Sequence, residues 1–314
     1  MDNSPPRIAP ADAPGIAQAA AILRAGGLVA VPTETVYGLA ARADSDAAVA
    51  GIYRAKGRPD FNPLIVHVPD LASAERLGVV DETARKLVAA FWPGALTVVV
   101  PWRAEAGLAP AVTAGLPTVA LRCPANPVMQ ALLRESGLPL AAPSANRSGG
   151  VSPTSAEHVA ASLGGKVDLI LDGGATEQGI ESTIVAVRPG GGWEVLRPGP
   201  ITVEQIAAVL GDPQASTQSG GIEAPGQLAS HYAPGKPLRL NAETVGKDEF
   251  LIGFGAIDGA VNLSPSGDLA EAAACLYAAL HLAAAAPNSK VAVAPIPEHG
   301  IGIAINDRLR RAAA

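Results

Sequence analysis

Residues 53–66, Tyr-Arg-Ala-Lys-Gly-Arg-Pro-Asp-Phe-Asn-Pro-Leu-Ile-Val, join a basic cluster to an apolar run. Three cations fall within five residues, and the turn formers Pro59, Asn62 and Pro63 follow at once. The run Leu-Ile-Val that begins at residue 64 is typical of a buried strand. Because the whole chain has a net charge of −6, the positive cluster is a local feature. Cations held rigidly beside a core strand favour an anionic ligand over solvent.

Outward from this stretch, short runs rich in valine and isoleucine alternate with helical patterns. Helical periodicity is present at residues 16–25 and 81–92, and Asp81 is the expected N-cap of the second helix. Strands and helices mixed in this way predict an α/β or α+β architecture. The predicted strands are residues 28–31, 64–68, 96–100, 118–121, 169–171 and 183–187.

A change in composition after residue 211 divides the chain. Residues 212–221 hold almost no bulky apolar side chain, which is typical of a linker. A second unit follows, with strands expected at 250–253 and 290–293 and helices at 268–285 and 301–312. This order predicts a small parallel sheet. We therefore predict a first domain at 1–211, a linker at 212–237 and a second domain at 238–314.

Composition excludes several classes of protein. With 48% hydrophobic and 17% charged residues, the chain is not generally disordered. Aromatic residues are 4% of the chain, which argues against an array of base-stacking platforms. Cys123 and Cys275 are too few for a disulfide framework and are expected to be buried thiols. The lack of a signal peptide and of a long apolar run predicts a soluble cytoplasmic protein without a membrane partner.

Polar segments gather at the ends of the predicted strands, whereas motifs for a side-chain nucleophile, a Walker loop or a dinucleotide fingerprint are missing from the sequence. Each polar segment alone is explained by capping or surface pairing. Their joint occurrence indicates a site for a polar small molecule. The segments are residues 32–35, 56–58, Arg122, 143–148 and 181–183.

Taken together, these segments resemble the Sua5/YrdC/YwlC family, the L-threonylcarbamoyladenylate synthases, in its two-domain Sua5 form. The resemblance covers nearly the whole chain, and Ala224 stands where a serine is common in the linker motif. It implies a YrdC-like twisted mixed-sheet domain and a small Rossmann-like α/β domain joined by a long linker. The matching segments are residues 31–39, 56–59, 62–64, 91–97, 142–146, 148–149, 181–184, 197–199, 224–226, 231–234, 298–300 and 305–309.

The resemblance implies an enzyme that condenses L-threonine, bicarbonate and ATP to threonylcarbamoyl-AMP and pyrophosphate, a nucleotidyltransferase reaction. The product would supply the t6A modification at position 37 of tRNA through a downstream threonylcarbamoyl-transfer machinery. In the expected route the threonine amine first captures bicarbonate or CO2, and the resulting N-carboxylate attacks the α-phosphate of ATP. Both nucleophiles come from substrates, so the protein has to position them and offset their charge.

Carried over residue by residue, the resemblance also implies a site. Lys56 and Arg58 are the expected catalytic cations. Mg²⁺ is expected on the ATP phosphates, with no protein ligand assigned. Threonine is expected to contact Thr35, His67, Arg122, Ala142 and Ser182, with Arg122 on its carboxylate, and ATP to contact Arg58, Asn62, Thr118, Ser144, Ser152, Arg197 and Tyr232.

Tyr232 is an aromatic residue in the linker, and it would by itself be expected to pack on the nearest domain. The resemblance implies that residues 224–235 fold over the site as a lid and that Tyr232 covers the nucleotide. Pro225, Gly226, Pro234 and Gly235 would serve as pivots and stiffeners.

Two other interpretations remain open from the sequence. The first is a carbamoyl-adenylate-forming module of the hydrogenase-maturation type, although the zinc segments that accompany it are missing here. The second is a binding module for double-stranded RNA, which the acidic charge weakens. Transient contact with tRNA is compatible with either the enzyme or the binding module.

Overall fold

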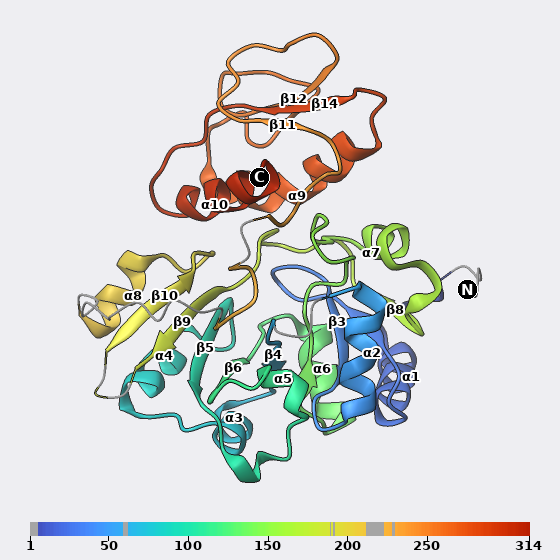
Figure 1. Ribbon diagram of the computed structural model, residues 1–314, viewed down its shortest axis with the longest axis vertical. Helices are drawn as coiled ribbons and strands as arrows, with labels where there is room; N and C mark the ends of the chain where they lie inside the picture. Colours follow the sequence, from blue (N-terminus) through green and yellow to red (C-terminus); the bar gives the residue numbers. More distant parts are fainter. Residues whose placement is uncertain (1–5, 59–61, 189, 191, 212–222, 228–229) are drawn as a thin grey trace.

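The computed structural model describes residues 6–58, 62–188, 190, 192–211, 223–227 and 230–314. Residues 59–61 of the opening stretch, and 212–222 and 228–229 of the predicted linker, lie outside the described residues. A large N-terminal unit and a smaller C-terminal unit are visible in Figure 1. The predicted mixed α/β fold with a second, parallel-sheet unit is confirmed.

A ten-stranded mixed sheet forms the N-terminal unit, in the order β1-β8-β2-β3-β7-β4-β6-β5-β9-β10. Strands that are far apart in the sequence are therefore neighbours in the sheet. The strands are β1 (Ile8–Pro10), β2 (Val29–Val31), β3 (Gly38–Arg42), β4 (Ile65–His67), β5 (Leu96–Pro101), β6 (Thr118–Arg122), β7 (Leu140–Ala141), β8 (Leu169–Asp172), β9 (Thr183–Val187) and β10 (Trp193–Arg197).

Helices cover both faces of this sheet, as alternation along the strands requires. Val29 and Val31 pack with α1 and α6, whereas Ala30 packs with α2 and its neighbours in the largest core cluster. Asp81 caps α4 through a hydrogen bond from Ala84 N at 2.9 Å, as predicted. The helices are α1 (Ala13–Arg24), α2 (Asp46–Lys56), α3 (Leu71–Leu77), α4 (Glu82–Phe91), α5 (Pro110–Thr113), α6 (Pro127–Ser136), α7 (Ala156–Leu163) and α8 (Val203–Leu210), with 3-10 turns η1 (Ala104–Ala106) and η2 (Gly164–Lys166).

One edge of the sheet collects the ends of several strands. β4 and β6 run parallel, so that their last residues, His67 and Arg122, pair in register. β5 is antiparallel to β6 and parallel to β9, which brings Thr183, at the start of β9, to the same edge. Arg197 ends β10 opposite Ile184. The polar segments predicted at strand ends therefore meet at this edge.

The C-terminal unit is a four-stranded parallel sheet in the order β11-β14-β12-β13. Its two helices lie between this sheet and the N-terminal unit (Figure 1). Sequence periodicity predicts the two central strands and both helices, and it misses the short outer strands β11 and β13. The elements are β11 (Leu238–Arg239), β12 (Glu249–Gly253), β13 (Val261–Asn262), α9 (Leu269–Ala285), β14 (Lys290–Val293) and α10 (Gly302–Ala312).

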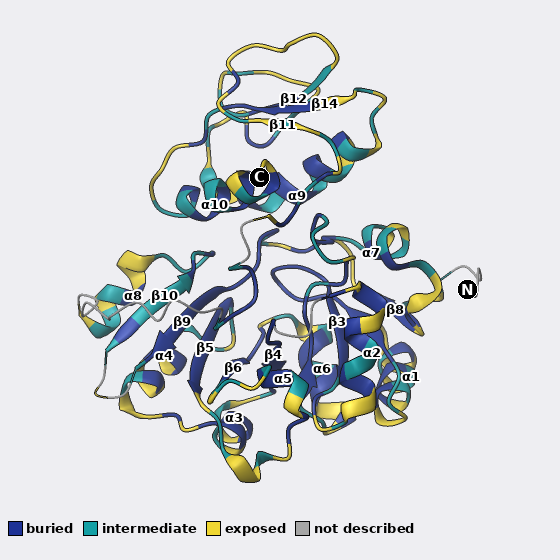
Figure 2. Cartoon of the chain, in the orientation of Figure 1, coloured by how far each residue is buried: buried dark blue, intermediate teal, exposed yellow. Residues whose placement is uncertain are grey.

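The two units are in close contact through α9 and α10. A Cβ built on Gly179, whose φ is 70°, would lie 2.4 Å from Ala274 O and 2.5 Å from Ala273 O. The rings of His158 in α7 and His281 in α9 stack, with centroids 3.9 Å apart. Buried residues line both sides of this junction in Figure 2. The close approach of α9 thus depends on the lack of a side chain at Gly179.

Two features of the described residues bear on the composition-based expectations. Both cysteines are unpaired; Cys123 is buried as expected, whereas Cys275 is partly exposed. Among the helices of the described residues, none combines the length and the apolar character needed to cross a membrane.

Candidate functional site

A pocket lies at the edge of the large sheet where β4 and β6 end and β9 begins. Nine of the thirteen predicted site residues line it. Its cavity volume, counted as the space open to the centres of water-sized spheres, is about 50 Å³, which is room for only a few water molecules. The pocket is therefore nearly filled by its own walls and by the linker. Its lining residues are Thr35, Val36, Arg58, Ile65, His67, Arg122, Ala142, Pro143, Ser144, Glu181, Ser182, Arg197, Pro225, Gly226, His231 and Tyr232.

Arg122 forms the charged floor of the pocket. Its Nη2 donates to Glu34 Oε1 at 2.7 Å, its Nη1 to Thr35 Oγ1 at 2.9 Å and its Nε to Gly94 O at 3.2 Å. Burial raises the pKa of the Glu34 carboxyl, but the charge and hydrogen bond of Arg122 outweigh burial and hold that pKa below its ordinary value. These bonds fix the guanidinium plane, and a guanidinium has five N–H donors. Arg122 is thus oriented and retains N–H groups for an anion.

His67 lies beside Arg122 at the end of β4 and lines the same pocket. Its side chain is 2% exposed, and its Nδ1 has no hydrogen-bond partner among the described residues. Burial and the neighbouring Arg122 charge lower the pKa of His67 to about 3. The ring is therefore neutral at physiological pH and offers a lone pair.

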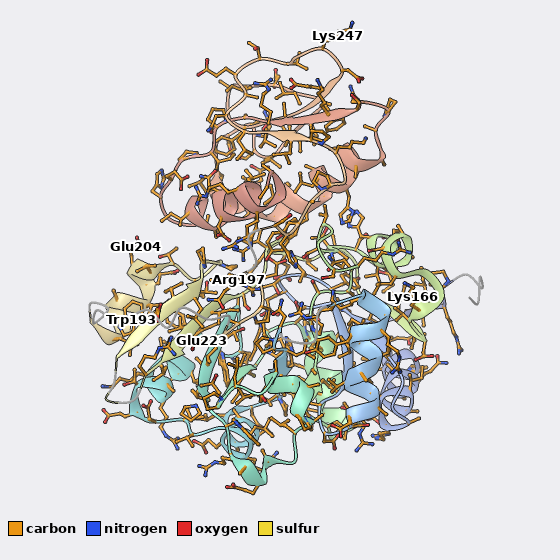
Figure 3. All side chains as sticks on the ribbon, viewed as in Figure 1. Lys166, Trp193, Arg197, Glu204, Glu223 and Lys247 are labelled. Atoms are coloured by element: carbon orange, nitrogen blue, oxygen red, sulfur yellow. The ribbon has the colours of Figure 1, made fainter. Side chains whose placement is uncertain are left out.

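Ser182 and Arg197 form the wall contributed by β9 and β10. Ser182 Oγ lies 2.8 Å from Thr97 Oγ1, and Arg197 Nη2 donates to Ser182 O at 2.9 Å. Burial lowers the pKa of Arg197, but a guanidinium titrates so high that it keeps its charge. Figure 3 places Arg197 close to the junction of the two units.

Arg58 follows α2, where Gly57 ends the helix in the left-handed conformation with φ of 62°. The turn sends the Arg58 side chain inward, where its Nη2 donates to Pro63 O at 3.0 Å. Burial lowers the pKa of Arg58 to about 10, so the residue stays a cation at neutral pH. Arg54, which lies within α2, is exposed.

Lys56 does not line the pocket. Its Nζ donates to Ser144 O and Asn146 O, both at 2.6 Å, and burial lowers its pKa well below the ordinary value. The side chain therefore holds the loop that carries Ser144. Asn62 is also buried near the pocket without lining it, and its Oδ1 has no partner among the described residues.

Ser152 and Thr118 are the other two predicted residues outside the lining. Ser152 is fully buried, and its Oγ donates to Glu181 Oε1 at 2.5 Å. Thr118 begins β6, whereas Arg122 ends it. Four steps of about 3.3 Å separate the two residues along the strand. The structure thus brings Thr118 to the opposite edge of the sheet from Arg122.

Glu181 is a functional candidate in the polar segment 181–183, and the sequence motifs predict no role for it. Besides Ser152, it accepts hydrogen bonds from Tyr277 OH at 2.9 Å and Arg308 Nε at 3.0 Å. Burial acts to raise its pKa, but the charges of Arg308 and Arg197 prevail and lower the pKa to about 2. Tyr277 and Arg308 belong to α9 and α10, so the second unit binds directly to a wall of the pocket.

Linker residues close the pocket from above. Tyr232 is 1% exposed and packs 5.6 Å from both the Tyr277 ring and the Arg308 guanidinium. Arg197 Nη1 donates to Pro225 O at 3.3 Å, and Ala233 N donates to Gly149 O at 2.9 Å. The linker thus contacts both units and the pocket arginines at once.

The pocket has an excess of positive charge. Among the described residues that line it, the three arginines Arg58, Arg122 and Arg197 stand against one carboxylate, that of Glu181. Within the described residues, no group of three or more His, Cys, Asp or Glu side chains is arranged to hold a metal ion. An anionic ligand fits this arrangement better than a bare cation.

Comparison with known protein families covers both units. A family model described as telomere recombination (Sua5, YciO, YrdC) matches residues 21–199. A second model, described as the C-terminal domain of threonylcarbamoyl-AMP synthase, matches residues 201–314.

Individual relatives extend over nearly the full chain. The threonylcarbamoyl-AMP synthase of Bacillus subtilis is 44% identical, over 96% of this chain and 93% of its own length. That of Pyrococcus abyssi is 38% identical, over 94% of this chain and 93% of its own length. The crystal structure of P. abyssi Sua5 complexed with L-threonine superposes with a TM-score of 0.87 at 36% identity, covering 95% of this chain and 94% of that one.

Proposed function

The chain belongs to the Sua5 family of threonylcarbamoyl-AMP synthases, and we propose that the pocket lined by Arg58, Arg122 and Arg197 is its site of synthesis. The reaction condenses L-threonine, bicarbonate and ATP to threonylcarbamoyl-AMP and pyrophosphate. Its product supplies the t6A modification of tRNA. The enzyme is therefore a nucleotidyltransferase.

The observation that carries the site assignment is the cluster of three buried arginines around one small cavity. Triphosphate, carboxylate and bicarbonate are all anions, and at bonding distance they repel one another strongly in a site of low dielectric. Fixed guanidinium groups offset this repulsion, and their positions need no reorganisation during the reaction. A nucleophilic side chain is not required because both nucleophiles come from the substrates.

Threonine fits the half of the pocket around Arg122. This guanidinium is oriented by Glu34 and Thr35, and it has N–H groups left to donate to a carboxylate. His67, Ala142 and Ser182 line the space beside it. The P. abyssi structure with bound L-threonine supports this placement at the level of the shared fold.

ATP fits the half that contains Arg58, Ser144, Arg197 and Tyr232. Lys56 stabilises this half from behind, since it bonds the carbonyls of the Ser144–Asn146 loop. Asn62 and Ser152 are proposed to reach the nucleotide when the linker has opened, whereas the position of Thr118 at the opposite edge of the sheet does not support its predicted contact with ATP. Mg²⁺ enters as the magnesium complex of ATP, because the described residues around the pocket provide arginines where a bare ion would need carboxylates.

The linker residues around Tyr232 act as a lid. The closed pocket has about 50 Å³ of free volume, which is far too little for ATP and threonine. The lid therefore opens to admit the substrates and closes again on the nucleotide, so that water is excluded. Downstream tRNA-modifying enzymes then take the product, with transient tRNA contact at most, and the reaction is proposed to run in the cytoplasm.

The test is incubation with ATP, bicarbonate and a panel of amino acids, with pyrophosphate and the adenylate measured by mass. We expect the adenylate with threonine well above that with serine or without an amino acid. Arg58→Ala and Lys56→Ala should each lose most of the activity while remaining folded. Arg54→Ala is the matched control, because this residue is exposed on the same helix.

Equal signals for threonine, serine and no amino acid would overturn the proposed function. RNA binding without ATP turnover would favour the binding module. Its affinity should then fall steeply with salt.

A further inference from the structure

The carboxylates and the lysine in and around the pocket are engaged in hydrogen bonds, whereas the Nδ1 atoms of two pocket histidines have no partner among the described residues. Glu181 accepts three hydrogen bonds, from Ser152, Tyr277 and Arg308. Glu34 is paired with Arg122, and its Oε2 accepts a hydrogen bond from Asn126 N at 3.3 Å. Lys56 donates to two carbonyls. A proton released inside the closed pocket therefore has few acceptors among the described residues.

Two pocket histidines have an unpartnered Nδ1, and their neighbours distinguish them. His67 pairs in register with Arg122, the residue proposed to hold the threonine carboxylate. His231 lies on the lid, and the cations that influence its titration are Lys56, Arg58 and Arg197. His67 therefore faces the amino-acid half of the pocket, whereas His231 faces the nucleotide half.

We propose that His67 is the general base that takes a proton from the threonine ammonium while the N-carboxylate forms. This inference rests on the proposed function. The His67 lone pair accepts one amine proton as the nitrogen attacks the carbon of bicarbonate. The C–OH bond breaks, and the hydroxide leaves as water with a second amine proton. The products are the N-carboxylate, water and imidazolium, which returns its proton to solvent when the lid opens.

Substrate binding prepares His67 for this step. Without substrate, burial and the Arg122 charge keep the pKa of His67 low, so the ring is neutral and ready to accept. Glu34, which is paired with Arg122, already opposes that charge, and a carboxylate bound to Arg122 opposes it further, so that the affinity of the ring for a proton rises. The base thus becomes stronger when threonine is in place. Positioned general bases typically contribute a factor of about 10²–10⁴ to the rate.

The experiment compares forward synthesis with its reverse in wild-type protein and in His67→Gln, which keeps polarity but cannot act as a base. We expect forward kcat to fall by about 10²-fold or more and the acidic limb of the forward pH profile to disappear. In the reverse direction, kcat for forming ATP from supplied threonylcarbamoyl-AMP and pyrophosphate should fall far less than the forward kcat, even if KM for the adenylate rises. The reason is that adenylation is reversed before any amine proton moves.

Each other outcome overturns the proposal. A rise in KM for threonine with unchanged kcat would make His67 a binding group only. Equal loss in both directions would make it structural. Loss of the acidic limb in His231→Gln, but not in His67→Gln, would assign the proton to the lid histidine. Failure of wild-type protein to form ATP in the reverse reaction would instead refute the proposed function, so the two failures are distinguishable.

Discussion

The pocket and the interface between the two units both contain a buried arginine–glutamate pair, yet their surroundings differ. At the interface, Arg308 binds Glu181, and Tyr277 and Ser152 complete the bonding of that carboxylate. In the pocket, Arg122 binds Glu34, but His67 Nδ1 nearby has no partner among the described residues. One region is saturated with hydrogen bonds, and the other is not.

This difference distinguishes polar groups that stabilise the contact between the two units from polar groups that are available to bind a ligand. A saturated buried network is destabilised strongly by the loss of one member, because a charge or polar group is left unpaired. An unsaturated group in a pocket already lacks its partner, so its removal costs little stability. Such groups become paired when a ligand arrives.

Arg308→Ala should weaken the association of the two units by about 3–5 kcal/mol, because the buried Glu181 carboxyl would lose its main cationic partner. Small-angle scattering and limited proteolysis of the linker measure the separation of the units. The synthase activity should fall as the association of the two units weakens, since Glu181 is part of the pocket wall.

Arg310→Ala is the control for this change. Arg310 is exposed on the same helix and pairs with Glu298 at 2.7 Å, and such surface pairs contribute about 0–1 kcal/mol. Equal effects of the two substitutions would break the contrast between the regions.

Gly179→Ala should push α9 away from the N-terminal unit, since its Cβ would lie within 2.5 Å of two α9 carbonyl oxygens. Strain at positive φ adds to this effect, and the total is expected to be about 2 kcal/mol or more. The loss of unfolding free energy is measured by denaturant titration. Gly174→Ala is the matched control, because Gly174 has φ of 79° with nothing within 4 Å of an added Cβ.

Acidification should separate the units before it unfolds them. Burial lowers the pKa of His281 to about 4 from 6.5, with His158 contributing, and burial also lowers the pKa of His158. The docked form therefore binds fewer protons, so docking is strongest above pH 6.5 and weakens as the pH falls toward 4. Glu157, on the same helix as His158, opposes this shift by favouring the cation of that ring.

Scattering between pH 7.5 and 4.5 measures this separation. His281→Gln should flatten the pH dependence over that window. The lowered pKa of Glu181 keeps this carboxylate charged down to about 2, so its contribution is retained throughout. A pH dependence that is the same in His281→Gln would contradict the assignment.

His67→Leu should leave the free energy of unfolding within about 1 kcal/mol of wild type, or raise it. The reason is that the imidazole is buried with an unpaired nitrogen and leucine has none. Thermal and denaturant unfolding measure the stability. A loss as large as that of Arg308→Ala would show that the pocket is also held by its polar groups.

Local sequence patterns could predict most of the strands and the parallel C-terminal sheet. The strand at 183–187 and its counterpart at 290–293 have the predicted bounds because apolar runs between turn residues are unambiguous. β3 is not among the predicted strands, since Gly38 at its start weakens the strand pattern. The order of the sheet depends on long-range pairing that a local pattern does not contain.

The candidate site shows the same limit. The sequence predicts that charged and polar residues at strand ends lie close together. Arg58, Arg122 and Arg197 do line one pocket. The hydrogen bonds of the buried Lys56 side chain to two backbone carbonyls could not be predicted from the sequence, because one of these carbonyls belongs to Ser144, 88 residues away. The pairing of Glu181 with Arg308 could not be predicted either, because the two residues are separated by 127 positions and belong to different units.

The backbone of Tyr232 adds a mechanical consequence. Its φ is 65° in the closed linker, a left-handed conformation that costs a non-glycine residue about 1–2 kcal/mol. The aromatic contacts of Tyr232 outweigh this cost in the observed position. If the proposed lid opens, the relief of this backbone strain would offset part of the lost contact energy and lower the cost of opening.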